Sequence, residues 1–358
     1  MKAWQIDRLG GTLELRDVDI PEARPGSVLV RIEASVLMSY LKSYVEGKLP
    51  IYDPPAGWFT PGGNAVGVVE AVGRDVWHIK PGARVLISSH IVAEERVAEP
   101  AQILLGVTAA GAAGKAVQRD WRDGTLAEFA LAPKSSVTPL DGLDDLDAIQ
   151  LSALTRFAVP YGGLVRGRLA AGETIIVSGA TGAYGGAAVF LALALGAGRV
   201  VAAGRNAGKL DGVARLAGPR VVPVVLSGDV AGDAARLVAA TDGGADIAFD
   251  MVGNAADPNA TLAALRALRR EGRLVLMGSM SVPLPISYLD VMLNSLEIIG
   301  QFMYPRDTYQ RLAALVRSGQ LDIGAITPRT YPLEDLPKAM EAAAKAGALD
   351  SIVITSNL

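Results

Sequence analysis

The stretch from Ile175 to Gly186 reads Ile-Ile-Val-Ser-Gly-Ala-Thr-Gly-Ala-Tyr-Gly-Gly, and it decides the fold. It joins a β-branched run, typical of a buried strand, to an apolar run with helical spacing. Such a turn lets a pyrophosphate approach the main chain, and the helix N-terminus offers it free N–H groups. The spacing here is G-x-x-G-x-x-G rather than G-x-G-x-x-G. Taken alone, the pattern also fits a turn that only lets helix and strand pack closely.

Strands and helices alternate on both sides of this turn. Continuous apolar strands between amphipathic helices indicate a parallel sheet covered on both faces, which favours dinucleotide binding over simple packing. We expect strands at 174–178, 199–203, 221–226, 246–250, 273–277 and 296–301, and helices at 186–195, 207–217, 231–240 and 259–268.

The residues at the end of the second expected strand indicate whether the cofactor is NAD(H) or NADP(H). An NAD site usually places a carboxylate there for the ribose 2′-hydroxyl. This chain instead has Gly204-Arg205-Asn206, with Lys209 a turn later, and Arg205 lies 20 residues after Gly185. A guanidinium can bind a 2′-phosphate bidentately. The sequence therefore predicts NADP(H), the alternative being that Arg205 is a solvated loop cation that tolerates NAD.

The remainder of the chain has a different pattern. Short β-branched runs punctuated by Pro and Gly suggest a small barrel or sandwich in the first third. Residues 89–120 show no strand period, and we expect an irregular, partly helical excursion there. The expected strands are 13–18, 27–34, 66–72, 84–88, 124–132 and 351–355, and the expected helices are 145–165, 308–318 and 334–346.

Composition excludes several classes of protein. The 358 residues carry a net charge of −3 with no basic stripe, which argues against nucleic-acid binding. The absence of cysteine removes disulfides, thiolate nucleophiles and Cys-ligated zinc. The first residues lack a signal-peptide layout, and glycines interrupt the one uncharged stretch long enough to span a membrane, 174–198. We therefore expect a soluble, cytoplasmic protein.

Several motifs together resemble the medium-chain dehydrogenase/reductase superfamily, the zinc alcohol dehydrogenase and quinone reductase group. The resemblance covers nearly the whole chain and implies a GroES-like β-rich catalytic domain, 1–156 and 301–358, around a Rossmann doubly wound parallel-sheet domain, 157–300. The motifs are Val28–Ser35, Pro61-Gly-Gly-Asn-Ala-Val-Gly67, Lys80-Pro-Gly-Ala-Arg-Val85, Gly124-Thr-Leu-Ala-Glu-Phe129, Asp246–Gly253 and Gly272–Gly278.

The departures from the family concern its two metal sites. The catalytic zinc ligands of the family fall on Leu37, on Gly63-Asn64 and at about Thr155, and none of these can replace a thiolate or imidazole. Residues 89–120 keep approximately the length of the family's structural-zinc lobe without a cysteine. The resemblance therefore implies a member without zinc, in which another group must polarise the substrate oxygen.

Ser39 and Tyr40 are our candidate catalytic residues. The resemblance places Ser39 where zinc members relay a proton and Tyr40 where they have an aspartate; a tyrosine hydroxyl can donate to a developing oxyanion. The alternative is that Tyr40, Tyr44 and Tyr52 are packing residues. Tyr44 and Lys48 match the Y-x-x-x-K pair of short-chain reductases, which we interpret as coincidence because the pair precedes the glycine turn. We expect His78 in an exposed turn and His90 on the surface, the alternative for His90 being a position in the cleft.

The remaining candidate residues bind the cofactor. Residues at the carboxyl ends of the fifth and sixth strands should approach the nicotinamide, and Tyr184 either covers the cofactor or fills the turn. By family analogy, apolar strands in 283–300 would form part of a homodimer or homotetramer interface. The expected cofactor-binding residues are Gly179, Thr181, Gly182, Ala183, Tyr184, Gly185, Gly204, Arg205, Asn206, Lys209, Met277, Gly278, Ser279, Gln301 and Phe302.

Three functions remain open at this level. The first is a zinc-independent NADP(H)-dependent oxidoreductase that transfers hydride to an activated C=C or C=O of a quinone, enone or carbonyl. The second is an alcohol dehydrogenase or ketone reductase in which Ser39 and Tyr40 replace the metal. The third is an NADPH-binding protein that has lost catalysis. The residues do not name the substrate.

Overall fold

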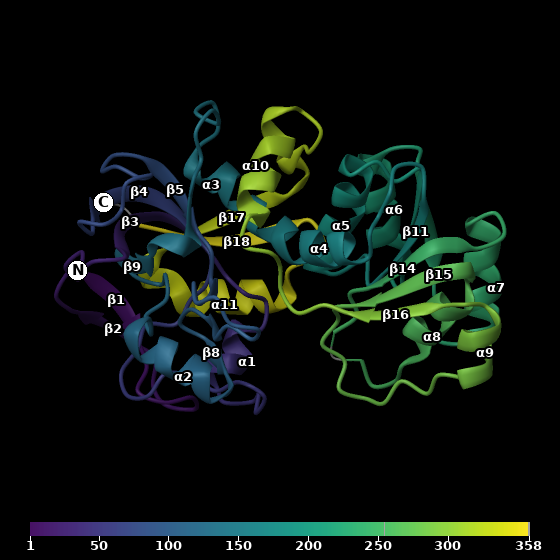
Figure 1. Cartoon of the computed structure of the whole chain (residues 1–358), viewed down its shortest axis with the longest axis horizontal. Helices are drawn as coiled ribbons and strands as arrows, with labels where there is room; N and C mark the ends of the chain where they lie inside the picture. The colour runs from purple at the N-terminus through teal and green to yellow at the C-terminus, as the bar shows by residue number, and fades with distance from the viewer. Residues whose placement is uncertain (254, 357–358) are drawn as a thin grey trace.

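A computed structural model describes residues 1–253 and 255–356 of the chain. Figure 1 shows two halves side by side, with helix α4 (Leu154–Arg166) between them. One half contains the glycine turn, and the other is built from both ends of the chain. In the described residues, no helix is long and apolar enough to cross a membrane.

The half with the glycine turn is a six-stranded parallel sheet. Its strand order is β13-β12-β11-β14-β15-β16, so the order reverses direction between β11 and β14, next to the turn. In open parallel sheets, ligands bind at this switch point. The predicted doubly wound α/β fold is confirmed. The strands are β11 (Thr174–Ser178), β12 (Arg199–Gly204), β13 (Val221–Val225), β14 (Ala245–Asp250), β15 (Leu268–Leu276) and β16 (Glu297–Gly300).

Helices connect these strands as the apolar spacing predicted. They are α5 (Ala183–Ala194), α6 (Ala207–Ala217), α7 (Val230–Ala240) and α8 (Asn259–Arg266). Asn206 and Asp229 cap α6 and α7 with their side chains, which satisfies N–H groups that the first helical turn leaves free. By contrast, no side chain caps α5, whose N-cap residue is Gly182.

The other half contains a seven-stranded sheet with contributions from distant parts of the sequence. Its order is β10-β5-β4-β3-β18-β17, with β9 also paired to β3. Val353 of β18 lies opposite Val36 of β3, so the chain's last strand completes a sheet begun by its third. This half is the predicted GroES-like domain. The strands are β3 (Ser27–Val36), β4 (Ala65–Val72), β5 (Arg84–Ile87), β9 (Phe129–Pro133), β10 (Val137–Pro139), β17 (Thr327–Pro332) and β18 (Asp350–Thr355).

Smaller elements complete this half. A separate ribbon pairs β1 (Lys2–Gln5) with β2 (Glu14–Asp17). The helices are α1 (Leu41–Val45), α2 (Gly111–Asp120), α3 (Ala148–Ser152), α10 (Thr308–Arg317) and α11 (Leu336–Lys345). The single helix predicted for 145–165 is two, because an Asp147–Gln150 capping box begins α3 and α4 starts separately at Leu154. The predicted domain boundary after residue 156 falls inside α4, and the boundaries stay a prediction.

Three expectations from the sequence were wrong. Residues 89–120 contain α2, as the partly helical prediction allowed, but the rest is not irregular, because it holds a three-stranded sheet; the strands β6 (His90–Val92), β7 (Gln102–Leu104) and β8 (Thr108–Ala110) are too short to show a period. Within 124–132 the strand starts only at Phe129, since Gly124 instead lies tight against the main chain of Pro61 and Gly62. Residues 283–300 form α9 (Tyr288–Leu293) and a single strand, β16.

Candidate active site

The glycine turn has the geometry that a phosphate site requires. Gly179 has φ +78°, which an L side chain rarely adopts. A Cβ on Gly185 would lie 2.1 Å from the carbonyl oxygen of Gly179, whereas one on Gly182 would meet only that oxygen, at 3.3 Å. Because α5 has no side-chain cap, its first N–H groups, at Ala183, Tyr184 and Gly185, are available to an anion. The turn therefore fits a dinucleotide pyrophosphate.

The candidate 2′-phosphate residues lie at the end of β12. Gly204 is buried at the last position of the strand, where a Cβ would press on Thr181 at 3.1 Å. Arg205 and Lys209 are exposed, and neither forms an ion pair with any residue that the structure describes. The Asn206 side chain is already used, since it accepts from the N–H of Lys209 at 3.0 Å. Two cations are thus free to meet a phosphate.

The nicotinamide-side candidates end neighbouring strands. Gly278 donates its N–H to the carbonyl of Asp250 at 2.9 Å, and a Cβ there would lie 2.1 Å from the Val252 carbonyl. Met277 packs against α4, because a Cβ on Gly163 would strike its sulfur. Ser279 is exposed beside Gly253, and Gln301 binds the Leu276 carbonyl through its N–H at 3.2 Å. All these positions as cofactor contacts stay predictions.

Tyrosines gather near the glycine turn. The rings of Tyr40 and Tyr52 stack with centroids 5.6 Å apart, and Tyr44 meets Tyr52 edge-on at 5.5 Å. Burial, followed by the charge of Tyr52, raises the pKa of Tyr40 well above its ordinary value, and Tyr184 adds to the effect. Tyr40 is therefore a neutral hydroxyl donor near neutral pH, close to Tyr184 of the turn. Its partner in our prediction, Ser39, is exposed next to it in the chain.

Tyr44 and Tyr52 differ from Tyr40 in role. Tyr44 is fully buried and donates its hydroxyl to the Val107 carbonyl at 2.6 Å. It is therefore a packing residue, and the interpretation of Tyr44 and Lys48 as a coincidental match holds. Tyr52 is half-buried, and burial raises its pKa as well.

A second polar group is centred on Tyr304. Its hydroxyl lies 3.1 Å from the Ser88 hydroxyl, 3.4 Å from Asn64 Oδ1 and 3.5 Å from the Tyr309 hydroxyl. Burial raises the pKa of both Tyr304 and Tyr309. The N–H of Ser89 donates to Asn64 Oδ1 at 2.7 Å, which fixes that atom as the amide oxygen.

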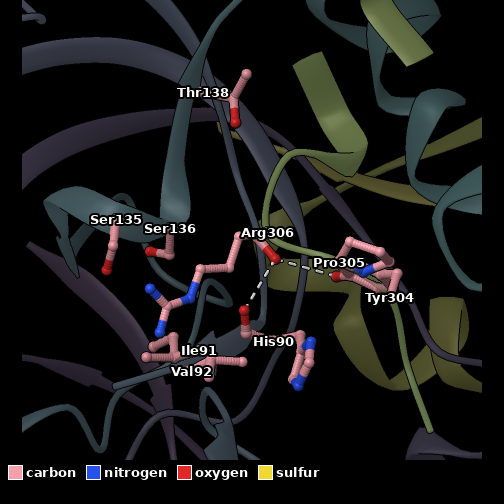
Figure 2. A pocket seen from close by; sticks show the side chains of 10 residues that line it. His90, Ile91, Val92, Ser135, Ser136, Thr138, Tyr304, Pro305 and Arg306 are labelled. Carbon is pink, nitrogen blue, oxygen red and sulfur yellow. Dashed lines mark hydrogen bonds between the residues drawn. The ribbon is translucent and has the colours of Figure 1, made fainter. Parts of the chain in front are cut away.

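His90 belongs to this group and is partly buried, which favours the alternative over our expectation of a surface position. Its ring meets Tyr304 edge-on at 5.4 Å and Phe302 at 5.9 Å, and its Nε2 lies 3.0 Å from Gln102 Oε1. Burial lowers the pKa of His90. Figure 2 shows a small pocket bordered by His90, Tyr304 and Arg306, with the Arg306 guanidinium extending toward Ile91. His78 is exposed, as predicted.

The positions that correspond to the family's zinc ligands do not fit a metal. Leu37 is buried in an apolar cluster, Gly63 has no side chain, and Thr155 is buried with its hydroxyl bonded to the Ser152 carbonyl at 2.8 Å. Among the described residues, no group of three or more His, Cys, Asp or Glu side chains could hold a metal ion.

Sequence reasoning missed three buried polar residues. Tyr304 and Tyr309 follow β16, but nothing local distinguishes them from surface tyrosines. Arg156, next to Thr155 in α4, is 4% exposed and carries a guanidinium whose Nε has no partner. A charged residue amid the apolar residues of a helix, between Thr155 and Phe157, was the available signal.

The fold and the glycine turn together define a dehydrogenase that uses a dinucleotide. Comparison with known families agrees: residues 24–142 match the alcohol dehydrogenase GroES-like domain, and residues 183–318 match the zinc-binding dehydrogenase family. The chain belongs to the medium-chain dehydrogenase/reductase superfamily and is an NAD(P)H-dependent oxidoreductase of that type.

Relatives with different activities resemble the chain about equally. It is 26% identical to an alcohol dehydrogenase of Cupriavidus necator, over 92% of each chain. It is 27% identical to a human quinone oxidoreductase, over 95% of this chain and 93% of the relative. A zinc-binding-type dehydrogenase structure from Sinorhizobium meliloti, bound to NADP, has a TM-score of 0.78 at 24% identity and covers 99% of this chain and 98% of its own.

Proposed function

We propose that this protein is a zinc-independent, NADP(H)-dependent reductase that transfers hydride to the activated C=C or C=O of a small molecule such as a quinone, an enone or another carbonyl compound. The observation that carries the proposal is the placement of the neutral Tyr40 hydroxyl near Tyr184 of the glycine turn, in a chain whose residues at the family's zinc positions do not fit zinc.

The proposed cofactor is NADP(H) rather than NAD(H). Arg205 and Lys209 follow β12 without a carboxylate beside them, and a guanidinium can bind a 2′-phosphate through two parallel bonds. The NADP bound to the Sinorhizobium meliloti protein supports this choice. When bound, NADPH would supply the hydride.

The chain's own residues would manage the proton and the developing charge. Tyr40 would donate its hydroxyl proton to the substrate oxygen as negative charge accumulates on that oxygen. Because the pKa of Tyr40 is raised, the hydroxyl keeps its proton until then. Exposed Ser39 would return a proton from water. Apolar Met277 and the tyrosine rings would keep water from the reacting atoms.

A panel of substrates tests the proposal. NADPH oxidation would be followed with quinones, enones, aldehydes and ketones, and the reverse reaction with alcohols and NADP⁺. We expect turnover of quinones or enones. Turnover of alcohols and simple ketones alone would favour the second candidate, an alcohol dehydrogenase without zinc, which the relationship to the Cupriavidus enzyme supports. Binding of NADPH without any turnover would favour the third, a non-catalytic NADPH-binding protein.

A pair of variants tests the role of Tyr40. Tyr40→Phe removes only the hydroxyl, and we expect a fall in kcat of about a hundredfold with unchanged NADPH binding. Tyr288→Phe, on exposed α9, is the matched control and should keep full activity. Equal activity of the two variants would reject Tyr40 as the proton donor.

Metal analysis tests the independence from zinc. The purified protein should contain no stoichiometric zinc, and treatment with a chelator should leave the turnover rate unchanged. One zinc per chain, or loss of activity on chelation, would reject this part of the proposal.

We also propose that the protein is a homodimer or a homotetramer. Helix α9 exposes four large apolar side chains, and Ile298 on the adjacent edge strand β16 is exposed as well; the four are Tyr288, Leu289, Met292 and Leu293. Such a patch beside an open strand edge is typical of a subunit interface. Leu289→Glu with Leu293→Glu should therefore reduce the mass measured by light scattering to that of one chain, while a wild-type mass of one chain would contradict the proposal.

A further inference from the structure

Arg156 is a buried cation that forms no ion pair in the described part of the chain, although the charge of Asp350 acts on it from a greater distance. Its guanidinium makes one hydrogen bond, from Nη2 to the Asp350 main-chain carbonyl at 3.3 Å, and its Nε has no partner in the described part of the chain. Burial lowers the pKa of Arg156, although a guanidinium stays protonated in proteins. A buried charge in this condition is costly unless a partner neutralises it.

The chain's other buried charges are compensated. Asp233 pairs with Arg236 and accepts the N–H groups of Ser227 and Gly228, Asp246 pairs with Arg269, and Asp250 accepts from Thr261 and from the main chain. These three carboxylates and Arg156 are the charged side chains buried in the described structure. Of these four side chains, Arg156 alone has neither an ionic partner nor a full set of hydrogen bonds.

The location of Arg156 indicates which ligand could neutralise its charge. Helix α4 packs along α5. Asp350, whose carbonyl accepts the hydrogen bond from Arg156, belongs to a segment that also passes the first turn of α5. The contact is made by Ala348, two residues before Asp350, because a Cβ on Gly186 would lie 2.7 Å from the Cβ of Ala348. Tyr184, inside the glycine turn, is close enough to act electrostatically on the guanidinium. The cation thus lies beside the uncapped N-terminus of α5.

We propose that Arg156 binds the pyrophosphate of the dinucleotide, as a side-chain cation that supplements the main-chain N–H groups of the glycine turn. The proposal rests on the cofactor assignment above. It assigns the pyrophosphate to Arg156, which is buried, and the 2′-phosphate to Arg205, which is exposed. Arg156 would then be a residue that lowers the stability of the free protein and raises its affinity for the cofactor.

Two matched variants distinguish the roles of Arg156 and Arg205. Their binding of the cofactor and of its fragments would be measured by calorimetric titration. The probes are NADPH, ADP-ribose, which has the pyrophosphate without the 2′-phosphate, and 2′-AMP, which has the 2′-phosphate without the pyrophosphate. Arg156→Met should weaken NADPH and ADP-ribose by about tenfold to a hundredfold and leave 2′-AMP unchanged. Arg205→Met should weaken NADPH and 2′-AMP and leave ADP-ribose unchanged.

Unfolding of the ligand-free protein gives a second readout. If Arg156 serves the cofactor, Arg156→Met removes an uncompensated charge and keeps a similar volume, so its urea midpoint should equal or exceed that of the wild type. If Arg156 were merely structural, the midpoint would fall and ADP-ribose would bind normally once the variant is folded.

Arg156→Lys covers the case in which the methionine variant does not fold. It keeps the charge but not the planar fork, so it should retain the fold and lose part of its affinity for ADP-ribose. Unchanged binding of ADP-ribose by either folded variant overturns the role of Arg156. Failure of the wild type to bind NADPH and ADP-ribose at all would instead overturn the proposed cofactor, so the two proposals fail in different ways.

Discussion

The glycine turn, which contains Tyr184, is constructed differently from the polar group of Asn64, Ser88, Tyr304 and Tyr309, which we call the tyrosine wall. The turn is eight consecutive residues, Gly179–Gly186, whose main-chain N–H groups would bind the cofactor; Gly182 and Gly185 lie against Gly179 within the turn, while Gly179 and Gly186 lie against Met251 and Ala348. The wall consists of side chains from segments far apart in sequence: Asn64, Ser88 and Tyr304 meet across 240 residues. The glycine turn can therefore be recognised in one short segment of sequence, whereas the wall forms only when distant segments meet in the fold.

The largest effect should come from breaking the turn. Gly185→Val would drive a side chain into the Gly179 carbonyl, and we expect a loss of ~3 kcal/mol or more in the free energy of unfolding. Gly182→Ala is the informative counterpart, because a Cβ there meets a single atom, the Gly179 carbonyl oxygen at 3.3 Å, and the φ of −91° is ordinary. It should keep the stability of the wild type and weaken NADPH binding. Urea unfolding and NADPH titration of both variants would measure this; equal stability losses would contradict the separation of packing from binding.

A smaller effect is expected from the wall. Tyr304→Phe removes the hydroxyl shared by Ser88, Asn64 and Tyr309, leaving buried polar atoms with fewer partners. We expect a loss of about 1–3 kcal/mol in the free energy of unfolding. Tyr161→Phe, whose half-buried hydroxyl lies outside this group, is the control. A Tyr304→Phe protein as stable as the control would show that the wall is not a connected network.

The preference for NADPH over NADH, measured as the ratio of their dissociation constants, should fall about tenfold in Arg205→Ala. Arg205→Ala removes a charged hydrogen-bond donor to the 2′-phosphate, worth about 1.5 kcal/mol or more, and leaves NADH binding unchanged. Dissociation constants for both cofactors, measured on the wild type and the variant, give the ratio. If the ratio does not change, Arg205 does not select the cofactor.

The smallest effect concerns pH. Because burial holds the pKa of His90 below its usual 6.5, the unfolded chain binds a proton that the folded chain does not as the pH falls below about 6.5. The free energy of unfolding should therefore decrease from that pH down to the folded pKa of His90. His90→Gln should flatten this part of the profile. His78→Gln, at an exposed position, should leave it as in the wild type; a profile unaffected by His90→Gln would place that ring in water.

The same contrast explains what could be predicted from the sequence. Strands β11, β12 and β14 and helix α6 were predicted to within a residue, since each has an uninterrupted local pattern. Tyr40 and Tyr184 could be proposed from the sequence because motifs mark their positions. Tyr304, Tyr309 and Arg156 were not, because their importance lies in contacts with Asn64, with Ser88 and with Asp350. The three-residue strands β6, β7 and β8 were missed for a related reason, because they are stabilised by pairing with each other and by burial.

The pairing of β18 with β3 also determines the order in which the chain can fold during synthesis. The sheet that contains Val36 is completed only after Val353 has been synthesised and has paired with it. Contacts between residues so distant in sequence form slowly. The six-stranded sheet is made from the continuous segment 174–300, so it can fold as soon as that segment has left the ribosome. The nascent protein can therefore have a cofactor-binding half ready while the other half still has an unpaired edge at β3, and a chain truncated before Asp350 would keep that edge open to aggregation.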